Sequence, residues 1–391
     1  MTDADTAPPF TLGVEEEYYL VDRDTGDLVP TVPEGLVAEC EKRLPRQVTP
    51  EFLQTQIEIG TRVCVNIAEV REELCRLRGE IADVTKSYGL GMIAASTHPF
   101  GTWHGQHHTR KERYDAIQDQ YGAPARRLLI CGMHVHVGIA DDEVRVDLMN
   151  QFSYFLPHLL ALTTSSPFWE GEDTGLKSYR LTVWDGLPRT GLPPQLSSWH
   201  EYERLVEQLV AAGSIEDGSK LWWDVRPSAR FPTLESRIFD VCTRIEDAVT
   251  IAALTQCLYR MLWRLRRQNQ RFRVYPTALI DENRWRAMRY GLDQGLIDFG
   301  ENQVKPMDVL VDEMIAMVEP DAEALGCRDE IEHARDIVRD GTSAHRQLAV
   351  WRMLCNDGAE PLDAARGVVD MLMQESLIGI EPKARGAQTT G

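Results

Sequence analysis

The chain has 391 residues, a formal net charge of −19 and the apolar and charged fractions of an ordinary globular protein. This acidity makes nucleic acid and anionic membranes unfavourable partners, and no apolar run reaches the length of a membrane-spanning helix. The eight cysteines form no C-x-x-C pair, which favours free thiols in a reducing compartment over a disulfide framework or a zinc site. Because the first residues also lack the basic start and apolar core of a signal peptide, we expect a cytoplasmic protein with no nucleic-acid or membrane partner.

Residues 13–20 are predicted to form the first strand, and they contain three consecutive glutamates. Because side chains alternate along a strand, Glu15 and Glu17 share one face and Glu16 points to the other. Two carboxylates on one face repel each other, and a fold tolerates them most readily when a cation lies between them. A solvated edge strand whose charges prevent aggregation is the alternative.

A second strand is predicted over residues 52–62, with Glu58 on its polar face and Glu51 just before its regular part. A helix with an apolar stripe follows over 68–88, and then a short buried strand over 91–99. The polar loop after this strand is either functional or an ordinary surface loop, and its candidates are His104, His107, His108 and Arg110.

Residues 131–139 are predicted to form a strand in which His134 and His136 share one face and four apolar residues share the other. Two imidazoles on one face suit a metal or phosphate site. Polar core residues with satisfied hydrogen bonds are the alternative. The pairing of the two imidazoles favours the functional interpretation modestly.

Two further arginines are candidate anion contacts, because a guanidinium fork matches carboxylate and phosphate oxygens. Arg180 lies between Gly- and Pro-rich ordered loops, where a plain salt bridge would explain it equally well. Arg237 shares a face with Glu235 on a strand predicted over 232–240, next to another strand over 221–226. The pair is either a metal ligand beside a phosphate clamp or a surface ion pair of little energy.

The rest of the chain is predicted to be helical, over residues 248–267, 282–291 and 306–380. The basic run that ends the first of these helices suits the negative end of the helix dipole and carries no expected chemistry. The arginines of the second helix form a mostly solvated face, with room for one of them to turn toward a site; they are Arg284, Arg286 and Arg289.

Four predicted strands thus each place carboxylates or imidazoles on one face. Oxygen-rich sites of this kind suit Mg²⁺ or Mn²⁺ rather than structural zinc, and two or three such ions could neutralise the phosphates of a nucleotide. The arginines would then orient an anionic substrate and stabilise charge during phosphoryl transfer. A metal-dependent hydrolase could use the same ligands, so the residues alone leave that alternative open.

Five motifs in this order resemble the type 2 glutamate–cysteine ligase family, the ATP-dependent carboxylate–amine ligases with a glutamine synthetase-like fold. The motifs are Gly-Val-Glu-Glu-Glu at 13–17, Thr-His-Pro-Phe at 97–100, Gly-Met-His-Val-His-Val-Gly at 132–138, Trp-Asp-Val-Arg-Pro at 223–227 and Thr-Leu-Glu-Ser-Arg at 233–237. The resemblance implies an α+β fold, in which a curved antiparallel sheet of about six strands is backed by helices. It covers residues 10–378, which we expect to form a single catalytic domain with disordered tails at 1–9 and 382–391.

The resemblance also implies roles for individual residues. His136 would contact the nucleotide phosphates, and Arg237 the transferred phosphoryl group. Arg180 and Arg226 would hold the substrate carboxylate or the acyl phosphate. Because Glu16 points away from the metal ligands, we expect the replacement Glu16→Gln to be nearly silent. The divalent ions would be bound by Glu15, Glu17, Glu51, Glu58, His134 and Glu235.

The implied reaction uses ATP, with Mg²⁺ or Mn²⁺ as two or three ions, to join a small-molecule carboxylate to an amine. ATP would phosphorylate the side-chain carboxylate of glutamate, and the amine of cysteine would then attack the acyl phosphate to give γ-glutamylcysteine. Three alternatives stay open: the same chemistry with another carboxylate or amine, a metal-dependent amidohydrolase, and a non-enzymatic nucleotide-binding regulator. A homo-oligomer is compatible with the sequence but is not indicated by it.

Overall fold

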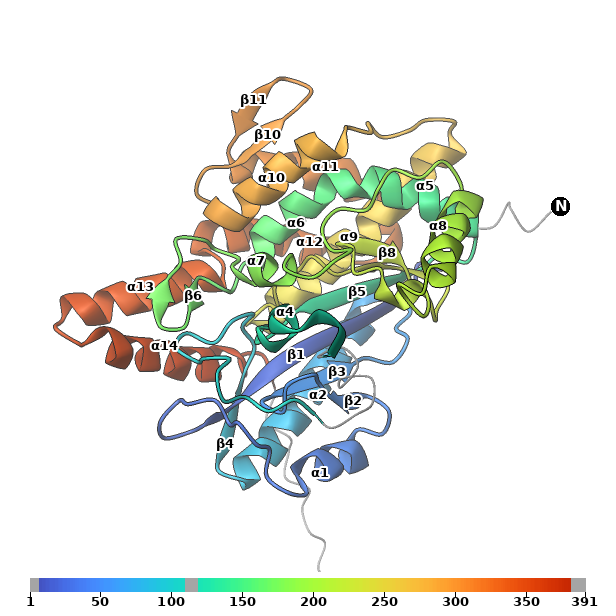
Figure 1. The fold of residues 1–391 in the computed structure, drawn as a ribbon. Coiled ribbons are helices and arrows are strands. Elements are labelled where there is room, and N and C mark those ends of the chain that lie inside the picture. The colour runs from blue at the N-terminus through green and yellow to red at the C-terminus, as the bar shows by residue number, and fades with distance from the viewer. Residues whose placement is uncertain (1–6, 110–118, 381–391) are drawn as a thin grey trace, which may run out of the picture.

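A computed structural model describes residues 7–109 and 119–380 of the chain, and at its centre lies a seven-stranded sheet (Figure 1). Its strands are β1 (Leu12–Asp22), β2 (Val48–Pro50), β3 (Gln56–Gly60), β4 (Leu90–Ile93), β5 (Met133–Gly138), β8 (Val225–Pro227) and β9 (Thr233–Ser236). Neighbouring strands are antiparallel, in the order β2-β3-β1-β5-β9-β8, and β4 pairs with the end of β1. The expected α+β fold is therefore confirmed, with one strand more than six.

Two small hairpins and a set of helices complete the described part of the chain. The hairpins join β6 (Phe168–Trp169) to β7 (Glu172–Asp173) and β10 (Leu296–Asp298) to β11 (Gln303–Lys305). The helices are α1 (Leu36–Arg43), α2 (Ile67–Ser87), α4 (Ala123–Arg126), α5 (Asp142–Phe152), η2 (Ser153–Phe155), α6 (Leu156–Thr163), α7 (Arg180–Trp184), α8 (Trp199–Ala211), η3 (Gly218–Lys220), α9 (Ile245–Arg267), α10 (Thr277–Tyr290), α11 (Met307–Leu325), α12 (Arg328–Asp340), α13 (Ser343–Asn356) and α14 (Pro361–Glu375). Within residues 7–109 and 119–380, no helix is both long and apolar enough to cross a bilayer.

Helices α2 and α9 cover one face of the sheet and form its core with it. Both helices contact β1, and α9 also contacts β5. Because side chains alternate along each strand, the face turned toward the helices is apolar and the opposite face carries the charged residues. The buried apolar residues of β1 and β5 on the helix side are Leu12, Val14, Tyr18, Met133, Val135 and Val137.

Helix α2 matches its prediction within one residue at each end. It begins after Asn66, whose side chain accepts a hydrogen bond from the Glu69 backbone N–H and so caps the first turn. Arg78 lies in the buried stripe and is itself fully buried, which the periodicity did not indicate. The apolar residues of that stripe are the predicted ones, Val70, Leu74, Leu77, Ile81 and Val84.

Arg78 forms a buried ion pair with Glu16, the middle glutamate of β1. Its Nη2 lies 2.6 Å from Glu16 Oε1, and its Nε lies 2.9 Å from Oε2. Glu16 therefore points away from the charged face, as predicted. The expectation of a silent replacement loses its basis, because Glu16 neutralises a cation in the core. The other N–H groups of Arg78 donate to the backbone carbonyls of Cys242, Thr243 and Ser376.

The second strand, β3, begins at Gln56 rather than at residue 52. Residues 52–54 hydrogen-bond with a neighbouring loop instead: the Phe52 carbonyl accepts from the Thr109 N–H, and the Gln54 N–H donates to the His107 carbonyl. These pairings are long-range, so alternation along the sequence could not reveal them. Because β2 ends at Pro50 and β3 begins at Gln56, Glu51 lies in the connection between these two strands.

Strands β4, β5, β8 and β9 are also shorter than predicted, because nearby side chains and loops take over their backbone hydrogen bonds, whereas β1 extends beyond 13–20 at both ends. After β4 ends, the Ala94 N–H donates to Ser376 Oγ, and the Ser96 N–H donates to Ser165 Oγ. The predicted strands over 131–139, 221–226 and 232–240 reduce to β5, β8 and β9 in the same way. Helix α10, in contrast, begins at residue 277 rather than 282.

Some expectations concern residues outside the described ranges. Arg110 lies there, as do the expected disordered tails except for residues 7–9. The single-domain organisation over 10–378 stays a proposal.

We predict that Glu16→Gln destabilises the protein, because it leaves the Arg78 guanidinium charged and without its counter-ion in the core. Breaking one side of a buried ion pair costs about 3–5 kcal/mol. The matched control is Glu39→Gln, which removes an exposed pair with Arg43 on α1 and should cost less than about 1 kcal/mol. Urea unfolding of both variants measures the difference, and equal stabilities would contradict the prediction.

Candidate active site

All ten residues to which the family resemblance assigns a role line one cavity of about 360 Å³ on the charged face of the sheet. None of the eight cysteines lines it, and neither do the loop histidines at 104, 107 and 108. Residues from the strands of the sheet, from their flanks and from the start of helix α7 therefore converge, although they are spread over more than half of the chain. They are Glu15, Glu17, Glu51, Glu58, His134, His136, Arg180, Arg226, Glu235 and Arg237.

The register of the sheet brings the charged residues together. Glu17 lies opposite Glu58 on β3, and Glu15 lies opposite His134 on β5. On the other side of β5, His136 lies opposite Glu235. Because directly opposite residues in an antiparallel pair are close neighbours, pairing alone creates a row of ligand-type side chains across four strands.

Three carboxylates, Glu17, Glu51 and Glu58, form a group that we call the acidic triad. Each offers an oxygen within 4.8 Å of the others. Burial and the charge of Glu51 raise the pKa of Glu17 to about 8, and the same two causes raise the pKa of Glu58 well above its usual range. Crowded carboxylates that resist ionisation are a fitting ligand set for a divalent ion, because the ion replaces the protons and removes the repulsion.

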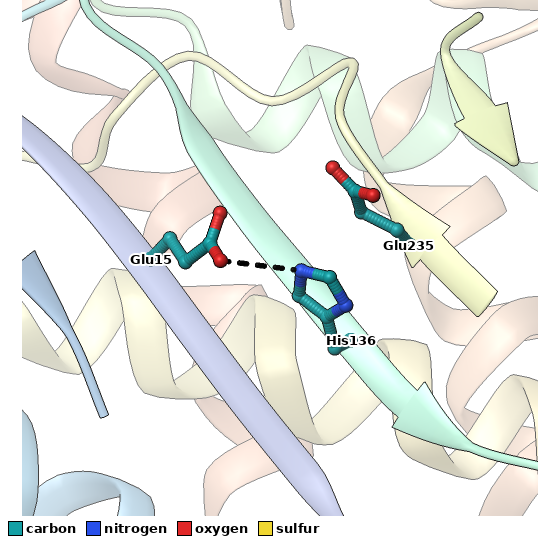
Figure 2. Close-up of side chains that lie close together, drawn as sticks. All are labelled: Glu15, His136 and Glu235. Atoms are coloured by element: carbon teal, nitrogen blue, oxygen red, sulfur yellow. Dashed lines mark ion pairs between the residues drawn. The ribbon is translucent and has the colours of Figure 1, made fainter. Parts of the chain in front are cut away.

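A second group, the mixed triad, consists of Glu15, His136 and Glu235, from β1, β5 and β9 (Figure 2). Their ligand atoms also lie within 4.8 Å of one another. His136 Nδ1 lies 3.0 Å from Thr233 Oγ1, which fixes the ring, and Nε2 lies 3.5 Å from Glu15 Oε1. Within the described residues, that buried Nε2 has no hydrogen-bond partner. An oriented imidazole with a free nitrogen beside two carboxylates also fits a divalent ion.

The acids of the mixed triad ionise readily, in contrast to those of the acidic triad. Burial raises the pKa of Glu15, but its polar interactions with His134 and His136 outweigh burial and lower the pKa well below its usual range. For Glu235, burial is likewise outweighed by the charges of Arg237 and Arg226, which lower its pKa. The mixed triad is thus neutralised by cations that the protein supplies itself.

His134 lies beside the mixed triad, with Nδ1 3.1 Å from Glu15 Oε2. Burial and the charge of Arg237 lower the pKa of His134 to about 4, so the ring is neutral at pH 7. The geometry therefore groups His136 with the two acids and leaves His134 next to them. A metal-binding role for His134 and a phosphate-binding role for His136 both stay predictions.

The three candidate arginines differ in how many of their N–H groups the protein already uses. Arg226 donates to both oxygens of Glu235, at 3.0 and 3.2 Å, and to two backbone carbonyls. Arg237 donates to Glu235 through Nη1, while its buried Nε has no hydrogen-bond partner in the described residues. The Nε of Arg180 also has none among these residues, while its Nη1 and Nη2 donate to the backbone carbonyls of Arg237 and Ile238. Arg180 and Arg237 are therefore the better placed to receive an anion.

Several cavity residues escaped the sequence reading. Trp184 and Trp222 form an aromatic wall, and Arg237 lies over the Trp184 ring at 5.8 Å from its centroid. Phe231, which is 58% exposed, lies at the cavity edge next to the His136 ring. The sequence offered a weak signal for them, since aromatic side chains in Gly- and Pro-rich segments need a surface to pack on.

The comparisons with known proteins agree on one family. A model of glutamate–cysteine ligase family 2 matches residues 11–370. A relative from Rhodospirillum rubrum, provisionally named glutamate–cysteine ligase 2, is 54% identical over 385 residues, which is 97% of this chain and 99% of the relative. A protein of the same name from Ruegeria pomeroyi is 56% identical over 366 residues, which is 94% of each chain.

Solved structures share the fold at low sequence identity. A glutamate–cysteine ligase from Francisella tularensis, solved in complex with AMP, has a TM-score of 0.69 and 14% identity, covering 96% of this chain and 90% of that one. A bifunctional glutathione synthetase from Pasteurella multocida has a TM-score of 0.67 and 13% identity, covering 94% of this chain and 52% of that one. At these identities the likeness shows the fold alone.

We predict that Mg²⁺ binding releases protons, because the ion binds carboxylates and the pKa of Glu17 is about 8 in the metal-free protein. Below that pKa the ionised fraction falls about tenfold for each pH unit. The affinity should therefore rise between pH 6 and pH 8 and level off above it. Isothermal titration in two buffers of different ionisation enthalpy counts the protons, and an affinity independent of pH would contradict the prediction.

We also predict that Gly132→Ala weakens anion binding. A Cβ at this position would lie 2.3 Å from Arg180 Nη2, and the Gly132 N–H donates to Glu17 Oε2 at 2.7 Å. The displaced guanidinium should reduce affinity for the substrate carboxylate, measured with glutamate, about tenfold, or about 1.4 kcal/mol. Gly13→Ala is the control, because its Cβ would make an ordinary 3.6 Å contact. Equal affinities for the two variants would disprove this account of Gly132.

Proposed function

Because the chain belongs to glutamate–cysteine ligase family 2 and is an ATP-dependent carboxylate–amine ligase, we propose that it joins the side-chain carboxylate of glutamate to the amine of cysteine. The product would be γ-glutamylcysteine, formed through an acyl phosphate. The observation that carries this proposal is the cavity itself, which is lined by two ligand triads and by two arginines that each have an unpartnered Nε within the described residues.

The donor sets fit divalent ions, and the residues that would hold them follow from the geometry. The acidic triad would hold one ion and the mixed triad another, with His134 next to the second. Mg²⁺ or Mn²⁺ bound there would neutralise phosphate oxygens and polarise the phosphorus. A third ion stays within the expectation of two or three.

In the first step, an oxygen of the substrate carboxylate attacks the γ-phosphorus of ATP, and ADP leaves. The N–H groups of Arg180 and Arg237 would donate to the oxygens that gain charge in this step, since both lie on the cavity wall with an unpartnered Nε. Arg226 would contribute mainly charge, because most of its N–H groups are engaged by Glu235 and backbone carbonyls.

In the second step, the amine nitrogen attacks the acyl carbon, the C–O bond to phosphate breaks, and an amide forms. The wall of Trp184 and Trp222 would limit the access of water, which competes with the amine for the acyl phosphate. No residue needs to form a covalent bond to the substrate. The absence of cysteines from the cavity lining agrees with this.

The experiment that tests the proposal measures phosphate release with ATP, Mg²⁺ or Mn²⁺ and glutamate, against a panel of amines that includes cysteine. We expect cysteine to stimulate release and mass spectrometry to find γ-glutamylcysteine. Stimulation by a different amine would keep the chemistry and replace the acceptor. Amide hydrolysis without ATP would overturn the proposal in favour of an amidohydrolase.

We predict that Glu58→Gln reduces this turnover at least about a hundredfold, because the acidic triad loses a charged ligand. The fold should stay intact, or become more stable without metal, since the substitution removes repulsion among buried carboxylates. Glu39→Gln, far from the cavity, serves as the activity control. Thermal unfolding and phosphate release on the same samples separate the two effects, and an active Glu58→Gln enzyme would disprove the assignment.

A further inference from the structure

Arg284 on α10 is a buried residue whose guanidinium lies between two carboxylates. It is 5% exposed and does not line the cavity. Its Nε lies 2.7 Å from Asp224 Oδ2, and its Nη1 lies 2.7 Å from Asp185 Oδ2. Contacts of Nη2 at 2.9 Å to Asp185 and 3.4 Å to Asp224 complete both pairs. Only a planar fork can satisfy two carboxylates in this way; an ammonium group is a point charge.

Asp185 connects Arg284 to the first wall of the cavity. It directly follows α7, the short helix that begins with Arg180 and ends with Trp184. Both of those residues line the cavity. A shift of Asp185 would therefore move a candidate anion-binding arginine and the aromatic wall together.

Asp224 connects Arg284 to the opposite wall. Its backbone carbonyl accepts a 2.7 Å hydrogen bond from the Arg237 N–H, and Arg226 follows two residues later on β8. Both arginines line the cavity. The position of Asp224 thus fixes the backbone of the two arginines that contact Glu235.

Arg284 is the cation that holds the two acids together. Among the described residues, it is the only partner in an ion pair for either Asp185 or Asp224. Asp224 is 1% exposed, so water cannot replace the guanidinium there. Without Arg284, two carboxylates would face each other and push α7 away from β8.

We propose that Arg284 is a positioning residue for the carboxylate substrate: it sets the spacing between α7 and the β8–β9 edge and so the relative placement of Arg180, Arg226 and Arg237. This inference rests on the proposed function and on the predicted role of Arg180 and Arg226 in holding the substrate carboxylate. The acidic triad lies on other strands and should not depend on Arg284. Arg284, the buried arginine of α10, is thereby assigned a positioning role.

The test compares Arg284→Lys with Arg286→Met, a control on the same helix whose guanidinium donates to the carbonyls of Gly295 and Gln294 and lies over the Tyr290 ring. In Arg284→Lys, the KM for glutamate should rise at least tenfold, while the KM for ATP and the affinity for Mg²⁺ change less than twofold. Hydrogen–deuterium exchange should increase over residues 180–187 and 223–227 and stay unchanged in β1. The control variant should match the wild type in every measurement.

Two results would overturn the proposal. One is unchanged exchange and an unchanged KM for glutamate in Arg284→Lys; the other is an equal rise of both KM values, which would mean general loosening. If Arg284→Lys does not fold, Asp185→Asn replaces it, because this variant keeps the Asp224 pair and should shift the same quantities in the same direction by less. If the wild type does not ligate glutamate, the proposed function fails, and the exchange measurement, which needs no substrate, still decides the positioning role.

Discussion

The structure depends on how β1 carries charge on both of its faces. Glu15 and Glu17 point into the cavity, while Glu16 points into the core and pairs with Arg78. A slip of one residue in the pairing of β1 would exchange the faces and bury two carboxylates without partners. Such a slip would also move Glu16 away from Arg78 and break the ion pair between them. The buried pair therefore fixes the register that the site needs, and it does so through α2, a helix that has no contact with the cavity.

The surroundings of the two triads shift the pKa values of their carboxylates in opposite directions. In the mixed triad, histidines and arginines lower the pKa values of Glu15 and Glu235, so these acids are ionised before any ion arrives. In the acidic triad, burial and mutual repulsion raise the pKa values of Glu17 and Glu58. A divalent ion bound by the acidic triad would remove this repulsion between the carboxylates. The two sites should differ in how strongly pH affects their occupancy, because only one of them must lose protons first.

Alternation along the strands was sufficient to find the charged residues on the cavity faces of β1, β3, β5 and β9, but not Glu51 or Arg180, which lie outside those strands. The faces of β1, β5 and β9 follow directly from the period of two, and the register of an antiparallel sheet then brings those faces together. Roles specific to a family came from the motifs rather than from this geometry. The strand ends were less predictable, because loops and side chains compete for the backbone groups, as at residues 52–54.

The sequence did not indicate that Arg78 is buried, and it did not distinguish Arg284 from the other two arginines of α10. Arg78 occupies a stripe position in α2 where periodicity favours an apolar residue, and Arg284 sits among charged residues that mostly face water. What distinguishes each of them is a carboxylate that is distant in the sequence: Glu16 for the first, Asp185 and Asp224 for the second. Local sequence patterns cannot predict such distant partners, whereas they predict most of the strands.

Charge changes in one direction across the sheet, and this gradient gives the cavity its chemistry. In the order β3, β1, β5, β9 and β8, the cavity face passes from carboxylates to imidazoles and then to guanidiniums, which surround the single carboxylate of Glu235. Divalent ions favour the first side and anionic groups favour the last. A polyphosphate chain bound between them can contact ions at one end and arginines at the other. An oxygen that gains negative charge midway is therefore stabilised from both sides, which is the requirement of phosphoryl transfer without a glycine-rich phosphate loop.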